Sequence, residues 1–333
     1  MRSVGFGDGA LAAALGRQVT STKAEVGRLS IEATTGVARD LGHHLRGDLG
    51  ALAGLQGDLG RLAAYGVNAA TAALQAASMQ TALEALDGSA ADYATALVTA
   101  ASSSQPAQLS SVIGEGEQRF SAAIAALNTR VGARSLFAGV AVENAALAAP
   151  GAILDRLQTL TAAAQGADEL EAIVTAWFAD PAGFAAEGYT GGGPQGPVAV
   201  AAGEEVALDV TATDPLLHGT LAGLAIAALL DRGSFAGDAG VRADLARRAG
   251  ETLLEAQTDR AALAARLGSA EATIADAAAR NAAETSAHEL ARAELISVDP
   301  YEAATGLQAA RDRLETLYSI TARLSRLSLL DYL

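Results

Sequence analysis

The chain of 333 residues has no cysteine, few aromatic residues and no long apolar run. The absence of thiols excludes disulfide bonds, a catalytic thiolate and zinc sites with cysteine ligands. Aromatic residues make up 4% of the chain although half of it is hydrophobic, so the apolar content is mainly Ala and Leu, which favour helices. The longest nearly apolar run, Leu221 to Leu230, is about half the roughly 20 residues that a membrane span needs. The sequence therefore predicts long, thin, closely packed helices and no membrane insertion.

The chain is also short of positive charge. It carries 23 Lys and Arg against 38 Asp and Glu, which gives a net charge of −15. Binding to nucleic acid depends on Lys and Arg that neutralise phosphates, and an anionic membrane surface attracts the same residues. We therefore expect no nucleic acid and no anionic membrane surface among its partners.

Apolar side chains recur every three or four residues through the last stretch of the chain, residues 299–333. Such a narrow seam predicts a helix that packs against a partner helix. Chain ends usually fray and are polar, so we expect an apolar end of this kind to be covered. The seam positions are Leu307, Ala310, Leu314, Leu317, Ile320, Leu324, Leu327 and Leu330.

The first helical stretch has the same spacing, and Thr34-Thr35-Gly36 ends it with a glycine suited to a helix C-terminus. Two seams at opposite ends of one chain predict an antiparallel helix pair, whose outer faces would meet copies of the same pair or other proteins. Arg2 and the apolar patch Gly9 to Gly16 could be mistaken for a signal peptide, but the patch continues into the helix and we expect no cleavage. The seam positions here are Leu11, Leu15, Val19, Val26, Leu29 and Ala33, with Thr22 at one further position.

Between the termini the pattern predicts a helical rod with a small β insertion. Asp87-Gly88-Ser89 is expected to end the first long helix. The predicted helices are residues 48–86, 90–102, 108–131, 152–164, 167–179, 215–230 and 239–295. Residues 132–140 are predicted to form a turn and a short strand, with residues 140–147 as a possible hairpin partner. Residues 198–202 and 205–211 are predicted to form a pair of strands. The fold class is thus mainly α, a long antiparallel helical bundle or coiled coil formed by the N- and C-terminal regions.

Three domains follow from this pattern. Residues 1–40 with 297–333 would form a terminal-helix coiled coil for assembly. Residues 41–182 with 215–296 would form the helical rod, and residues 183–214 a small outer lobe. Trp177 and Phe178 are expected to anchor the core under that lobe.

Candidate chemical sites are weak in this sequence. His43-His44 lies near acidic residues, but the other histidines have no ligand spacing, which favours a solvated loop over a metal site. The glycines at 5–9 and 191–193 lack the Gly-Lys-Ser/Thr of a phosphate loop. Glu204-Glu205 sits at a predicted hairpin tip, where adjacent carboxylates are usually solvated. We therefore predict no catalytic residues, no cofactor and no metal, and a protein that is not an enzyme.

Three stretches carry a resemblance to a known family. Leu29 to Gly36 (LSIEATTG) looks like the close of the first helix in the flagellin superfamily. Ala126 to Gly139 (ALNTRVGARSLFAG) is similar to a segment of the hook–filament junction proteins of that superfamily, with Ser135 where a Tyr is usual. Asp299 to Leu333 resembles the C-terminal helix of the same proteins. With Tyr65 to Asn68, the likeness spans roughly residues 10–140 and 215–333.

The resemblance implies a structural protein of the bacterial flagellum that joins hook to filament through helix–helix polymerisation of its termini. Its location would be extracellular, after export through the flagellar type III channel without a cleaved signal peptide. The implied partners are further copies in a ring or layer, a neighbouring hook-associated protein, flagellin and an export chaperone. A short flagellin, the filament subunit itself, remains the alternative. A helical enzyme and a secreted helical scaffold remain open as other classes.

Overall fold

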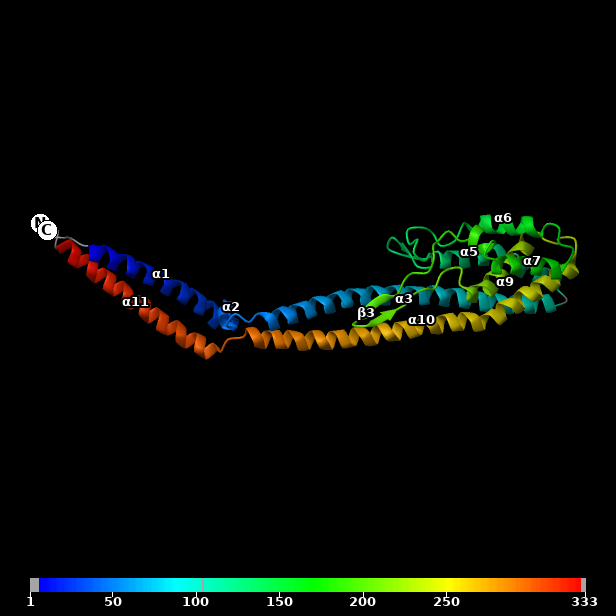
Figure 1. Cartoon of the computed structure of the whole chain (residues 1–333). Coiled ribbons are helices and arrows are strands. Elements are labelled where there is room, and N and C mark those ends of the chain that lie inside the picture. The colour runs from blue at the N-terminus through cyan, green and yellow to red at the C-terminus, as the bar shows by residue number, and fades with distance from the viewer. Residues whose placement is uncertain (1–5, 104, 331–333) are drawn as a thin grey trace. The chain divides into compact units, whose positions relative to one another are not determined.

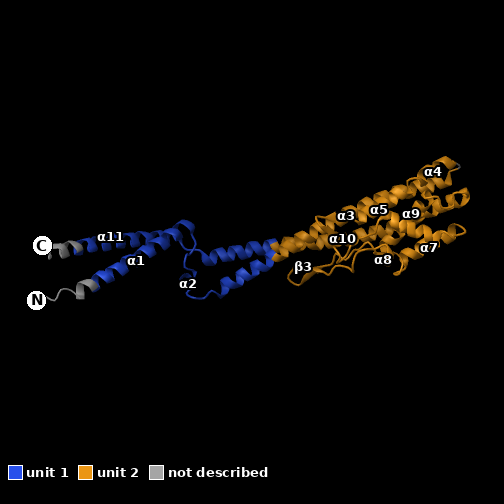
Figure 2. Cartoon of the chain, turned by 90° about the horizontal axis from the view of Figure 1, so that it is seen from above, with its two compact units in different colours: residues 1–63, 282–333 blue, residues 64–281 orange. Residues whose placement is uncertain are grey.

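The computed structural model describes residues 6–103 and 105–330, with side chains over 10–103 and 105–324. These residues fall into two compact units, coloured separately in Figure 2. Unit 1 comprises residues 1–63 and 282–333, and unit 2 comprises residues 64–281. Long helices dominate both units, with two short hairpins, so the prediction of a mainly α bundle with a small β insertion is confirmed.

Unit 1 is built on two long helices, α1 (Phe6–Thr35) and α11 (Pro300–Leu330). They run antiparallel and side by side in both views (Figure 1, Figure 2). The short α2 (Leu41–His44) follows α1, and Asp40 caps it by accepting a hydrogen bond from the His43 N–H. The unit also contains the start of α3 (Gly50–Ser102) and the end of α10 (Ala239–Ile296).

In unit 2 the rest of α3 and α10 is joined by a group of shorter helices. The most buried of them is α9 (Pro215–Asp231), whose side chains are covered along most of its length. Glycines allow the close approaches at its sides: a Cβ at Gly116 would lie 2.4 Å from the Ala227 carbonyl oxygen. The others are α4 (Pro106–Ile113), α5 (Gly116–Leu127), α6 (Pro150–Thr161), α7 (Ala167–Ala179) and α8 (Phe184–Glu187).

The strands form two antiparallel hairpins, β1 (Arg130–Val131) with β2 (Arg134–Ser135) and β3 (Val198–Ala201) with β4 (Glu204–Val206). The second hairpin is fastened to the long helices through its backbone. Asn68 on α3 donates to the Ala199 carbonyl, and Asn281 on α10 donates to the next carbonyl, that of Val200. Buried carbonyls need such donors, so these two amides fix where the hairpin lies.

The segment Ser135–Gly139 is buried beneath the loop that contains residues 191–193. The Val140 N–H donates to the Gly193 carbonyl, and the Gly192 N–H donates to the Ala138 carbonyl. Gly139 has φ +59, and a Cβ there would lie 2.1 Å from the Gly193 oxygen. Gly139 therefore permits the close approach of the two backbones, and Gly191 contributes to it because a Cβ there would lie 2.6 Å from the Ala138 carbonyl oxygen.

One predicted helix end is wrong. α3 continues unbroken through Asp87-Gly88-Ser89. The Asp87 carboxylate accepts a hydrogen bond from the Arg260 side chain of α10 at 2.6 Å, and Arg260 also bonds the hydroxyl of Thr220 on α9. Because Asp87 is engaged across the bundle, it does not cap a new helix.

Other predicted boundaries also change. The helix expected over 108–131 is two helices, α4 and α5, divided at Gly114, and its last residues form β1. The turn and short strand expected over 132–140 correspond to the turn at 132–133 and to β2, whose partner is β1, while residues 140–147 form no partner strand. The strand expected over 205–211 is the three-residue β4. The remaining predicted helices correspond to α6, α7, α9, α10 and α11, while the three-domain division stays a prediction.

Replacing Gly88 with Ala should stabilise the fold by about 0.5–1 kcal/mol, because alanine is the better residue inside a helix and a Cβ at position 88 meets no atom within 4 Å. Urea unfolding followed by the helical circular dichroism signal measures the change. Gly250→Ala is the matched control. Its Cβ would lie 2.8 Å from the Ala94 carbonyl oxygen, so it should cost about 1–3 kcal/mol. A loss of stability in Gly88→Ala would contradict an unbroken α3.

Candidate functional site

The two terminal helices meet along a heptad seam. On α1, Thr22 and Leu29 are buried seven residues apart; on α11, Ala303, Ala310 and Leu317 are buried with the same spacing. A period of seven is that of a left-handed coiled coil in which side chains of one helix fit between those of the other. The seam mixes large and small side chains, so the two helices pack closely.

The seam residues predicted from the sequence lie on the paired helices α1 and α11 and differ in exposure. Leu29 and Leu317 are buried, while Leu11 and Ile320 are exposed by 47% and 40%. The seam positions are seven residues apart and continue from Leu317 to Leu324, so Ile320 lies beside the seam. Leu327 and Leu330 lie outside the side chains that the structure describes. The half-buried members are Leu15, Val19, Val26, Leu307, Leu314 and Leu324.

Polar contacts across the pair agree with an antiparallel register. The Arg313 guanidinium lies 3.7 Å from the Glu25 carboxylate, and the Lys23 ammonium lies 5.9 Å from the centre of the Tyr318 ring. Exposed contacts of this kind contribute about 1 kcal/mol or less each. The seam, rather than these contacts, therefore holds the pair together.

Apolar side chains remain on the outside of the pair. Tyr301 is 79% exposed, and Tyr318 is 46% exposed. Leu11, Ile31 and Ile320 are exposed as well. These exposed apolar side chains are distributed along the pair and are available for contact with a further surface.

Charge is distributed unevenly along the chain. Residues 1–40 contain five Lys and Arg and four Asp and Glu, and residues 297–333 contain four Arg and five Asp and Glu. Together the two terminal segments are neutral, so the intervening residues carry the whole net charge of −15. Copies of this chain that approach through their terminal helices are therefore not repelled by those helices.

A buried carboxylate, absent from the sequence prediction, ties α1 to the segment that follows it. Glu32 is 4% exposed, accepts a hydrogen bond from the Arg39 backbone N–H at 3.0 Å and pairs with the Arg28 guanidinium at 2.6 Å. Its only signal in the sequence is an arginine four residues earlier on the same helix face. Glu32 therefore fixes the path of the chain as it leaves α1.

The same turn is joined by backbone hydrogen bonds to the end of α10 and to the segment that connects α10 with α11. The Ala38 N–H donates to the Ile296 carbonyl, and the Val298 N–H donates to the Gly36 carbonyl, each at 2.9 Å. Gly36 has φ +69, a left-handed conformation that glycine adopts without strain. The segment that follows α1 and the segment that precedes α11 are therefore held together by these hydrogen bonds.

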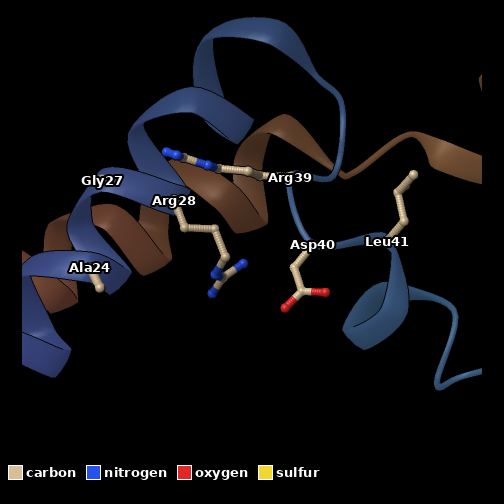
Figure 3. A pocket seen from close by; sticks show the side chains of 6 residues that line it. All are labelled: Ala24, Gly27, Arg28, Arg39, Asp40 and Leu41. Carbon is tan, nitrogen blue, oxygen red and sulfur yellow. The ribbon is translucent and has the colours of Figure 1, made fainter.

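An open pocket of about 620 Å³ lies beside this turn. Figure 3 shows the Arg28 and Asp40 side chains pointing to the same side and the Arg39 side chain pointing away from them. The pocket offers charged groups to solvent but no paired acid and base. Its lining residues are Ala24, Gly27, Arg28, Arg39, Asp40 and Leu41.

The candidate chemical residues lie apart. His43 and His44 are exposed on α2, whereas His218 packs edge-on to Phe184 in unit 2, where burial lowers its pKa. Within the described ranges, no three His, Cys, Asp or Glu side chains gather as metal ligands would. Over the same ranges no helix combines the length and apolar character needed to cross a membrane.

The residues around the β insertion have structural partners. Glu204 pairs with Arg280 of α10, while its neighbour Glu205 is exposed. Trp177 and Phe178 pack with Phe184 in one aromatic cluster. Both aromatic residues of α7 are buried, as predicted for core residues.

No protein-family model and no curated protein matches the chain. Among solved structures, the chain is similar to one from Vibrio parahaemolyticus that is described, provisionally, as a flagellar hook-associated protein. The two share 14% identity with a TM-score of 0.49, over 73% of this chain and 95% of the other.

Replacing Glu32 with Ala should destabilise the turn after α1 by about 2–4 kcal/mol, because it removes a buried, charge-assisted partner of the Arg39 N–H and of Arg28. Amide hydrogen exchange at Arg39 and Ala38 measures this directly. Glu25→Ala is the control: its pair with Arg313 is exposed and long, so exchange should barely change. Unchanged protection at Arg39 in Glu32→Ala would contradict the role given to Glu32.

Proposed function

We propose that this chain is a structural protein of the bacterial flagellum that joins the hook to the filament through its paired terminal helices. The observation that carries the proposal is the antiparallel seam between α1 and α11, in which two ends of one chain form a coiled-coil pair with apolar outer faces. The motifs at Leu29–Gly36, Ala126–Gly139 and Asp299–Leu333 support the same assignment by their resemblance to junction proteins.

The motifs have physical roles that suit such a protein. Leu29 to Gly36 contains a buried seam residue, the buried Glu32 and the glycine at the turn. Ser135 to Gly139 lies buried beneath the loop at 191–193, so it stabilises unit 2. The resemblance therefore falls on residues that shape the helix pair and its support, as expected for an assembly protein rather than an enzyme.

Assembly would take place by packing of outer faces between copies. The neutral terminal segments permit close approach, while the acidic remainder keeps the other surfaces apart. In this proposal the partners are copies in a ring or layer, a neighbouring hook-associated protein and flagellin, with a chaperone during export. The protein would be exported by the type III route, without cleavage, and would act outside the cell with no cofactor and no catalysis.

Loss of the gene tests this assignment. Electron microscopy of the deletion strain should show bare hooks, and flagellin should appear in the medium because subunits still reach the hook tip but find no junction. Bare hooks without any flagellin would instead identify the chain as a short flagellin. Normal filaments would contradict a flagellar role.

Two matched substitutions separate pairing within the chain from packing between chains. Leu317→Asp places a charge in the buried seam and should cost about 3 kcal/mol or more of helix pairing. Ile320→Asp alters a side chain that is 40% exposed, so it should leave the helical content unchanged yet prevent incorporation into filaments. Circular dichroism and immunogold labelling of filaments measure the two effects. Full incorporation of Ile320→Asp would contradict the use of this outer face.

A further inference from the structure

The outer face of α3 in unit 2 has a second apolar seam, which the described residues leave exposed. Val67 and Leu74 are 67% and 58% exposed, the most exposed Val and Leu side chains of that unit's helices. They lie seven residues apart, and the exposed Ala70, Ala77 and Thr81 complete a spacing of three and four. That spacing is the coiled-coil pattern, and it lies opposite the face on which α3 packs into the core.

This seam is also free of charge. No Asp, Glu, Lys or Arg occurs between Arg61 and Glu84, although residues 64–281 contain 11 Arg and 24 Asp and Glu. Two copies of so acidic a unit repel each other over most orientations. A charge-free face is where they can approach without burying unpaired carboxylates.

A shallow apolar groove of about 330 Å³ runs beside the exposed seam. It exists because the helices offer small side chains there, with Glu271 as the charged residue among those that line it. The seam is thus a ridge with a groove next to it on one surface. The small residues that line the groove are Gly66, Ala69, Ala70, Ala73 and Ala77 of α3 and Ala275 and Ala278 of α10.

We propose that this face binds the same face of a second copy of the chain, with the two α3 helices antiparallel about a two-fold axis. With the axis level with the midpoint between Ala70 and Leu74, Leu74 meets the partner's Ala70 and Val67 meets the partner's Ala77. Each large side chain then faces a small one, so the ridge of each copy enters the groove of the other. A parallel pair would oppose Leu74 to the partner's Leu74 and leave alanine opposite alanine.

The occupant is a second copy because one surface supplies both halves of the fit. A two-fold contact requires a self-complementary patch. The ridge and groove meet this requirement, and α3 contributes no charged side chain between Arg61 and Glu84, so Glu271 is the one charged residue among the described residues that line the groove. The pairing concerns unit 2 and is independent of the flagellar assignment, since it uses neither terminal helix.

Sedimentation of the full chain at tens of micromolar provides the first test. The wild-type chain should form dimers. Leu74→Glu should weaken their association by roughly tenfold to hundredfold, because it puts a charge in place of a leucine that the dimer would bury. Leu290→Glu is the matched control, since Leu290 of unit 1 is 63% exposed, and it should associate like the wild type. A monomeric wild type, or equal dimerisation of Leu74→Glu, would overturn the proposal.

Cross-linking tests the orientation and does not depend on how well Leu74→Glu folds. The chain has no cysteine, so Val67→Cys and Ala77→Cys chains each carry a single thiol for a short bis-maleimide. In the antiparallel pair, position 67 of one copy lies opposite position 77 of the other, while identical positions lie about 15 Å apart along the axis at 1.5 Å per residue. A mixture of the two variants should therefore cross-link well and each variant alone poorly. The reverse result would indicate a parallel pair, and no cross-linking in either would indicate another interface; both overturn the proposal.

Discussion

Burial of the narrow seam between α1 and α11 is the constraint on which unit 1 depends. In proteins most of the stability of a helix comes from packing of its apolar face rather than from helix propensity. Leu29 and Leu317 supply that packing from residues that stand almost at opposite ends of the chain. The chain must therefore return to its starting point before either terminal helix gains its stability, and the turns at Gly36 and Val298 hold the two crossings together.

The seam could be predicted from the sequence because its period is local: Leu15, Val26 and Leu314 lie on one face of their helices whatever else the chain does. Long-range pairing could not be predicted. Asp87 looks like a helix end until it is known that Arg260 lies beside it, 173 residues further along the chain. Glu32 looks like a surface residue for the same reason, because its main-chain partner at Arg39 appears only when the turn is folded.

Glycine positions also show that contacts between distant segments cannot be predicted from the sequence. Gly88 and Gly250 each interrupt a helical pattern, and the sequence indicated a helix end at Gly88, within Asp87-Gly88-Ser89, but not at Gly250. In the structure a Cβ at position 88 meets open space, whereas a Cβ at position 250 would meet the backbone of α3. Periodicity detects which face of a helix is apolar, but the distance between two backbones depends on the packed neighbours. This is why the long helices were predictable and their crossings were not.

The outer faces of the terminal helix pair and the exposed face of α3 permit different symmetries of association. Outer faces of the terminal pair can meet head to tail, so that each copy uses one face toward the preceding copy and another toward the next, and such contacts extend into rings or layers. The ridge and groove of α3 are self-complementary, so a contact there closes at two copies and cannot extend. A ring with all copies pointing one way excludes that antiparallel contact. The proposed α3 pair would therefore form between free chains, and incorporation of a copy into the proposed ring would have to open it.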